Sequence, residues 1–227
     1  MTARTYGQFC GLARALEIVG ERWSLLVVRD LVLGPKRFTE LRNGLPKIPA
    51  SVLPARLNEL EQWGVVRRRV LPGVDATVVY ELTEYGSELD QIVLQLALWG
   101  ARSLGEPAVE DVHTVDAAIL SLYTTFVAEA ALGLRVSFEL HYGEMVIHAL
   151  IDNGALKVAE GAYPDADLII EPHGPAMLKM WRGDMSAAEA VSTGQVTVYG
   201  DTRHLETFIQ VFHIGALPVP ERGLAVH

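Results

Sequence analysis

The feature that most constrains this chain is a change of hydrophobic period near Gly64. Before it, apolar residues recur at helical spacing from Leu53 to Trp63. After it, two β-rich runs, residues 65–71 and 78–82, flank a Pro-Gly pair, which predicts a hairpin. Three further helical segments precede these elements, at residues 12–19, 23–31 and 38–43. Short helices joined by a tight turn and followed by a hairpin predict a winged helix-turn-helix.

Proline and glycine set the expected ends of these helices. Gly20 is expected to close the first helix in the left-handed conformation. Residues 48–54 leave two alternatives open for the start of the fourth helix. Either Ser51 is its N-cap and the helix starts late, or it starts near Pro49 and kinks at Pro54.

Charge is unevenly distributed along the chain. Residues 1–107 carry 13 Lys and Arg against 12 Asp and Glu, whereas the remaining residues carry 6 against 16. Within the first part, residues 36–69 hold eight basic and three acidic residues. A basic stretch attracts a polyanion, which the acidic half repels. A solvated charged surface is the alternative interpretation, and the winged helix predicted around the stretch favours a polyanion.

Four blocks of the first hundred residues form a recognisable set. They read ALEIVGERWSLL (residues 15–26), RFTEL (37–41), RLNELE (56–61) and YELTEYG (80–86). In this order they resemble the HxlR-type winged-helix transcription regulators, over about residues 9–103. The resemblance implies a homodimer, held mainly by terminal helices, on a pseudo-palindromic double-stranded DNA operator. It also implies a cysteine near the N-terminus, and Cys10 stands at that place.

Seven side chains are expected to contact DNA. They are Lys36, Arg37 and Lys47 at phosphates, Ser51 and Arg56 on the recognition helix, and Arg67 and Arg69 on the first strand of the wing. For Arg56 an ion pair with Glu59 or Glu40 is the alternative. Arg68 is expected to point away from its two neighbours on the strand.

A long helix is expected after the hairpin, with Thr83 as its N-cap. One side of this helix is apolar, which suggests the face that dimerises. This side consists of Leu89, Ile92, Val93, Leu96 and Trp99.

The second half of the chain predicts an α+β domain with about five strands covered by helices. Residues 117–134 carry one charge, but Ser121, Thr125 and Glu129 recur every four residues, so we expect an amphipathic helix and no membrane span. Asp116 is expected to cap this helix. Strands are expected at residues 136–142, 145–151, 156–159, 166–170 and 196–199, and helices at 175–181, 187–193 and 202–213.

Three runs in this half carry a second resemblance. They are ADLII (166–170), WRGDMSA (181–187) and GQVTVYGD (194–201). They resemble the later part of sterol-carrier-protein-like domains, over about residues 120–213. The resemblance implies an apolar cavity for a lipid or another hydrophobic small molecule. The expected lining residues, each also typical of an ordinary core, are Phe126, Phe138, Leu140, Ile147, Met177, Met180, Trp181, Phe208 and Phe212.

No catalytic set, nucleotide-binding motif or cofactor site is expected from the sequence. His141 and His148 lack neighbouring ligands in the sequence, so no metal site is expected. Cys10 is a candidate redox switch, with Arg14 supplying the positive charge that would lower its pKa; otherwise it is a small core residue. One cysteine and no membrane span indicate a cytoplasmic protein.

The sequence therefore predicts an α+β protein of two domains. A winged helix-turn-helix occupies residues 1–105, a sterol-carrier-like domain 112–215 and a tail 216–227. The main hypothesis is a homodimeric repressor, not an enzyme, whose operator binding responds to a hydrophobic small molecule in the second domain. One alternative makes Cys10 a redox or electrophile switch with a structural second domain. The remaining alternative is a lipid-transfer protein or enzyme that contains a winged helix.

Overall fold

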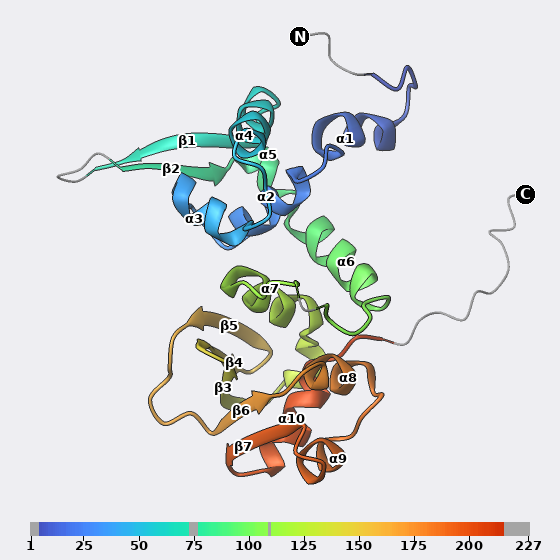
Figure 1. Cartoon of the computed structure of the whole chain (residues 1–227), viewed down its shortest axis with the longest axis vertical. Helices are drawn as coiled ribbons and strands as arrows, with labels where there is room; N and C mark the ends of the chain where they lie inside the picture. Colours follow the sequence, from blue (N-terminus) through green and yellow to red (C-terminus); the bar gives the residue numbers. More distant parts are fainter. Residues whose placement is uncertain (1–4, 73–76, 109, 216–227) are drawn as a thin grey trace, which may run out of the picture. The chain divides into compact units, whose positions relative to one another are not determined.

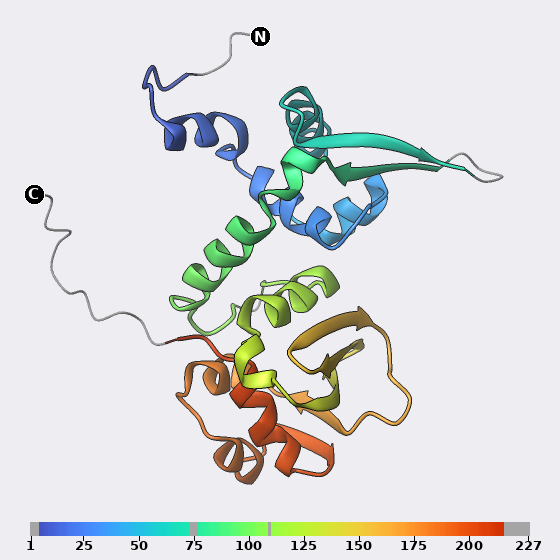
Figure 2. The ribbon, with the colours of Figure 1, turned by 180° about the vertical axis from the view of Figure 1, so that it is seen from behind.

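The computed structural model describes residues 5–72, 77–108 and 110–215. The chain divides into two compact units (Figures 1 and 2), Met1–Gln95 with Val112–Leu120 and Leu96–Asp111 with Ser121–His227. The domain boundary expected from the sequence at residues 105–112 stays a prediction, and the predicted tail at 216–227 lies outside the described residues.

The first unit is a winged helix-turn-helix, as the sequence predicted. Its helices are α1 (Gly11–Val19), α2 (Ser24–Val32), α3 (Phe38–Gly44), α4 (Val52–Gln62), α5 (Glu84–Ser87) and the start of α6 (Asp90–Ala101). The wing consists of β1 (Val66–Leu71) and β2 (Thr77–Leu82), which pair antiparallel (Figure 1). The predicted Pro-Gly turn falls partly on residues 73–76, outside the described residues.

The core of this unit consists of apolar residues at helical spacing. Leu53, Leu57 and Leu60 of α4 are buried together with residues of α2 and with Val93 of α6. Leu120 of α7 (Val115–Thr125) is buried in the same cluster. Because burying one such side chain stabilises the fold by about 1.5 to 3 kcal/mol, the start of α7 is held firmly to the winged helix.

One expected helix end differs from the structure, and another agrees with one of the two alternatives that the sequence left open. Gly20 is right-handed, with φ −77°, because its N–H continues the helical pattern by donating to the Leu16 carbonyl. The left-handed residue is Trp23, with φ 82°, just before α2. Helix α4 starts late, with Ser51 at the N-cap position but without a capping bond from its side chain. Pro54 therefore lies in the first turn, where its missing N–H breaks no helical bond.

Thr83 is an N-cap, as predicted, and its hydroxyl oxygen accepts a hydrogen bond from the Gly86 N–H at 2.9 Å. The single long helix expected after it is wrong, because α5 ends at Ser87 and α6 begins at Asp90. Gly86 of α5 lies close to the start of the wing. A Cβ at this position would lie 2.0 Å from the carbonyl oxygen of Val65, so α5 is pressed against the start of the wing.

The second unit has a five-stranded mixed sheet, close to the expected elements. The strands are β3 (Arg135–Tyr142), β4 (Met145–Asp152), β5 (Ala155–Glu160), β6 (Leu168–Pro172) and β7 (Val196–Gly200), in the order β5-β4-β3-β6-β7. Strands β3 and β6 are parallel, and the other neighbours are antiparallel. The helices are η1 (Ala128–Ala131), α8 (Ala176–Arg182), α9 (Ala187–Ser192) and α10 (Arg203–Val211), besides the ends of α6 and α7.

Both faces of β3 are buried. Phe138 and Leu140 lie on one face, where the rings of Phe208 and Phe212 at α10 lie 5.1 and 6.4 Å from the Phe138 ring. Glu139 lies on the opposite face. Helix α10 therefore covers the apolar face, which forms the core of this unit (Figure 2).

Helix α7 ends at Thr125, earlier than the sequence predicted, and no helix of the described residues is long and apolar enough to cross a membrane. The prediction that Asp116 caps this helix is wrong. The hydroxyl of Thr114 accepts from the Ala117 N–H at 3.4 Å instead, and the Asp116 carboxylate accepts from Lys36. Because Thr114 caps the helix, the carboxylate of Asp116 is available for the ion pair with Lys36.

Candidate functional site

The exposed face of α4, the second helix of the helix-turn-helix, is uncharged. Its exposed residues, including the N-cap position, are Ser51, Pro54, Ala55, Asn58 and Gln62. Of these, the sequence analysis singled out Ser51 alone as a DNA contact. Asn58 was missed, although its spacing from Ser51, two helical turns, places both on one side of the helix.

Arg56, the other predicted contact on α4, is turned away from this face. Its side chain is 14% exposed and forms ion pairs with Glu59 at 2.7 Å and with Glu21 at 3.5 Å. The alternative interpretation, an ion pair with Glu59, is the one present in the structure.

The arginines of the wing are also paired. Arg67 and Arg69 both contact the carboxylate of Glu81 on β2, each at 2.8 Å. Arg68 points the other way, as predicted, and contacts Glu61 of α4 at 2.9 Å. Hydrogen bonds from Arg69 and Arg67 lower the pKa of Glu81 despite its burial, so this carboxylate is ionised at neutral pH. One negative charge thus faces two positive charges, and this side of the wing keeps a net positive charge.

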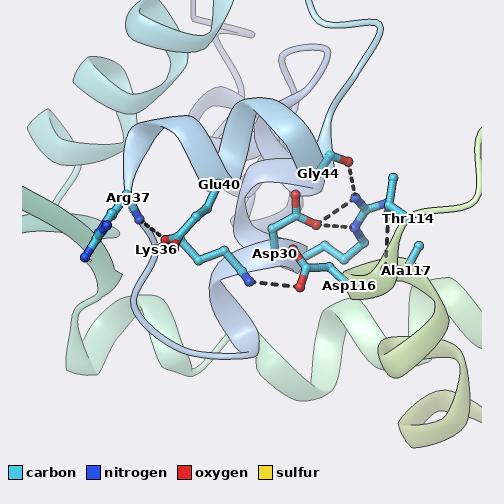
Figure 3. A network of polar contacts seen from close by, with 9 residues as sticks. Asp30, Lys36, Arg37, Glu40, Gly44, Thr114, Asp116 and Ala117 are labelled. Carbon is cyan, nitrogen blue, oxygen red and sulfur yellow. Dashed lines mark hydrogen bonds and ion pairs between the residues drawn. The ribbon is translucent and has the colours of Figure 1, made fainter. Parts of the chain in front are cut away.

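Lys36, expected at a phosphate, lies in a network of charges (Figure 3). Its backbone pairs with Tyr80 of β2, which holds the loop before α3 against the wing. Its ammonium group donates to the carboxylate of Asp116 at 2.8 Å, and both side chains are 17% exposed. Asp116 thus neutralises a cation of the DNA-binding unit from the first turn of α7.

A second carboxylate is buried in the same network (Figure 3). Asp30 of α2 is fully buried and accepts from Arg29 at 2.8 Å, while its second oxygen has no hydrogen-bond partner among the described residues. Burial raises the pKa of Asp30 to about 6, against the opposing effect of Arg29. Gly44 leaves room for both carboxylates, since a Cβ there would lie 2.6 Å from Asp30 Oδ2 and 3.3 Å from Asp116 Oδ2.

Three cations remain exposed near the helix-turn-helix. Arg37 precedes α3, Arg42 lies in its last turn, and Lys47 follows it. None of the three forms an ion pair with another described residue. Arg37 and Lys47 were predicted phosphate contacts, whereas Arg42 was missed although it lies in the basic stretch.

Comparison with known proteins places this geometry in a family. The profile described as HxlR-like helix-turn-helix matches residues 18–107. The HTH-type transcriptional regulator YodB of Bacillus subtilis is 40% identical over 85 residues, which cover 37% of this chain and 76% of YodB. The chain belongs to the HxlR-like helix-turn-helix family. This HxlR-like protein is therefore a DNA-binding transcriptional regulator, and the relatives that it matches are regulators rather than enzymes.

Two further relatives fall in the same region. The uncharacterized HTH-type transcriptional regulator YtcD of Bacillus subtilis is 34% identical over 106 residues, covering 47% of this chain and 84% of YtcD. A solved structure titled redox regulator HypR in its oxidized form is 36% identical, with a TM-score of 0.40, and the match covers 42% of this chain and 99% of that chain. The family profile ends at residue 107, so it does not include the five-stranded sheet of the HxlR-like protein.

Cys10 of the HxlR-like protein is exposed and occupies the N-cap position of α1. Backbone N–H groups of Ala13 and Leu12 lower the pKa of its thiol. Arg14, the expected source of positive charge, is instead bonded to Glu17 at 3.0 Å. The end of the helix, and not an arginine, is therefore what favours the thiolate.

The nine predicted ligand contacts all lie in the second unit, eight of them buried and Phe126 partly buried. The Phe126 and Phe208 rings both contact Phe212, at 5.6 and 4.7 Å. Leu140 and Ile147 are cross-strand neighbours on β3 and β4. Met177, Met180 and Trp181 are buried on α8. The nine residues belong to the core of this unit, and their role as ligand contacts stays a prediction.

A polar cluster occupies the opposite face of the sheet. Glu139 contacts His141 at 2.6 Å and accepts from the Tyr163 N–H at 2.6 Å. Burial raises the pKa of Glu139, but these hydrogen bonds outweigh it and the pKa is lowered. His148 contacts the carbonyl of Gly161 at 2.8 Å. The cluster fastens the loop after β5 to the sheet, and no group of three metal-ligating side chains is found among the described residues.

Proposed function

We propose that this regulator is a cytoplasmic homodimeric repressor whose operator binding is modulated by a hydrophobic small molecule held in the second unit. The observation that carries the proposal is the division of α7 between the units, with residues 115–120 in the first and 121–125 in the second. In the first unit Asp116 pairs with Lys36. In the second, the hydroxyl of Tyr123 accepts from the Val158 N–H on β5 at 3.1 Å. A ligand that displaced α7 would therefore act on both units.

The apolar core of the second unit supports a hydrophobic ligand. Met177 and Met180 lie on α8, and methionine is the side chain that repacks most readily around a guest molecule. The resemblance of residues 166–170, 181–187 and 194–201 to sterol-carrier-like domains agrees with such a ligand. The ligand would alter DNA affinity only by binding two states of the protein unequally.

Exposed apolar residues support a homodimer. Ile92, Leu96 and Trp99 lie on one exposed face of α6, whereas the other two predicted residues of this face, Leu89 and Val93, pack against the core of the first unit. The exposed large apolar residues of α1 and of the residue before Cys10 are Phe9, Leu12 and Leu16. Exposed apolar faces of this kind mark protein interfaces.

Native mass spectrometry of freshly purified protein tests the proposal. We expect a dimer with an added mass that is released on denaturation and that, when added back, changes the affinity for duplex DNA from the region upstream of its own gene. A monomer contradicts the homodimer. An adduct without effect on DNA affinity contradicts the effector role and leaves DNA binding unaffected.

The second candidate is a redox or electrophile switch at Cys10, favoured by the exposure of the thiol and by its lowered pKa. In this version the second unit is structural. Treatment with hydrogen peroxide should then change DNA affinity in the wild type but not in the Cys10→Ser variant. An equal response of both proteins excludes this candidate.

A further inference from the structure

We propose that α4 reads A·T base pairs in the major groove, with Asn58 binding an adenine and Ala55 contacting the methyl group of a thymine. This rests on the proposed operator binding. The first observation is the stripe itself. Ser51, Ala55, Asn58 and Gln62 follow one another by three or four residues and are all exposed. They therefore lie on one side of the helix, which is the side that a groove would meet.

The second observation is that this stripe contains neither arginine nor lysine. The commonest contact to guanine is a bidentate hydrogen bond from Arg or Lys to O6 and N7. The one arginine of α4, Arg56, is 14% exposed and held between Glu59 and Glu21. Reaching a base would break both ion pairs and leave Glu59 without its partner beside the negatively charged DNA. Arg56 is thus a structural residue of the helix.

The third observation is what the stripe does offer. The amide of Asn58 carries one donor and one acceptor side by side, which match N7 and the N6 amino group of adenine. Ala55, one turn earlier, presents a methyl group, which packs against the C5 methyl of thymine. Both residues lie in the first two turns of α4, and the first turns of a recognition helix are those that contact base edges.

The surrounding charges commit the occupant to a nucleic-acid duplex. Arg37, Arg42 and Lys47 are exposed around the helix-turn-helix, where phosphates can pair with them. The acidic residues of α4 are compensated, since Glu59 pairs with Arg56 and Glu61 with Arg68. An RNA duplex does not fit, because its deep and narrow major groove excludes a helix.

Selection from random DNA duplexes with the full-length protein tests the assignment. Four proteins are compared: the wild type, Asn58→Ala, Asn58→Arg, and Asn43→Ala as the matched control. Asn43 is an exposed asparagine of α3 and does not lie on α4. The wild type and the control should select an adenine at the same position. Asn58→Ala should lose that preference, with a fall in discrimination of about 5- to 150-fold, and Asn58→Arg should turn it toward guanine.

The melting temperature of Asn58→Ala should not fall, because the side chain is exposed and alanine favours the helix. The assignment is overturned if Asn58→Ala keeps the wild-type base preference at every position, or if the wild type selects no base. Both of those results leave DNA binding intact. Failure of the wild type to bind any duplex at low salt, or tighter binding to an RNA duplex, would overturn the operator proposal as well.

Discussion

At the scale of single residues, the most unusual group is Asp30. It is a fully buried carboxylate with one oxygen unpartnered among the described residues, and the charges that face it are Arg29, Asp116 and Lys36. The pKa of Asp30 is raised to about 6. The carboxyl group of Asp30 therefore binds its proton more tightly in the folded protein than in the unfolded chain. The contribution of Asp30 to stability is therefore greatest below pH 4 and is lost as the pH rises through 6.

Asp30→Asn should remove this pH dependence. Between pH 4 and pH 7 the wild type should lose stability relative to the variant by an amount on the order of 3 kcal/mol. Chemical denaturation at several pH values measures the difference. Asp152→Asn is the control, because Asp152 is an exposed carboxylate of β4, and its pH profile should follow the wild type. Parallel profiles for the wild type and Asp30→Asn would contradict the burial of a titrating charge.

The residues of the DNA-binding face were only partly predictable. The sequence identified the basic stretch and placed Arg37 and Lys47 correctly on the surface, because exposed cations need no partner. It offered the ion pair of Arg56 with Glu59 as an alternative, because the two residues lie one helical turn apart. It could not reveal that Lys36 is paired, since its partner Asp116 lies 80 residues away. Asn58 was missed, although its spacing from the three leucines of α4 indicates an exposed position. Its exposure depends on which side of α4 the three leucines occupy.

At the scale of elements, the first turn of α7 pairs through Asp116 with Lys36, a predicted phosphate contact. Asp116→Asn should free the ammonium group of Lys36 for a phosphate. We expect tighter binding to a duplex and a salt dependence steeper by about one unit in the slope of log K against log salt. Fluorescence anisotropy across a salt series measures both quantities.

The control for this experiment is Glu110→Gln, which changes the net charge equally. Glu110 is exposed and forms no ion pair with a described residue. Adding Lys36→Met to Asp116→Asn should cancel the gain, because the freed cation is then absent. An equal gain in Asp116→Asn and Glu110→Gln would mean that net charge alone, and not the ion pair, sets the affinity.

Most elements were predictable because their signals are local. The leucine spacing of α4, the β-rich runs of the wing and the alternation in β3 and β4 each lie within a dozen residues. The breaks were harder. The expected helix after Thr83 divides between Ser87 and Asp90. Nearby, Gly86 packs against Val65, a contact across about twenty residues that no periodicity records. Asp116 was assigned as a cap by its position, whereas its partner Lys36 lies 80 residues away.

At the scale of the whole molecule, the proposed dimer depends on exposed apolar residues of α6. Trp99 is 69% exposed, more than Ile92 or Leu96 on the same face. Exposed tryptophans that become buried in an interface are frequent hot spots, each worth about 2 kcal/mol or more. Trp99→Lys should therefore raise the dimer dissociation constant about 30-fold or more, as measured by sedimentation over a range of concentrations.

Tyr199→Lys, at an exposed aromatic residue of β7, is the matched control and should remain a dimer.

A comparison of the wild type with Trp99→Lys also tests whether the proposed dimer is needed for operator binding. A dimeric helix-turn-helix protein reads half-sites about one helical turn, 34 Å, apart, so inserting five base pairs between them should abolish tight binding by the wild type. The Trp99→Lys variant, as a monomer, should bind the original and the lengthened site equally. If the wild type bound the original and the lengthened site with equal affinity, this would contradict a fixed dimer on the operator, whatever the oligomeric state of the free protein.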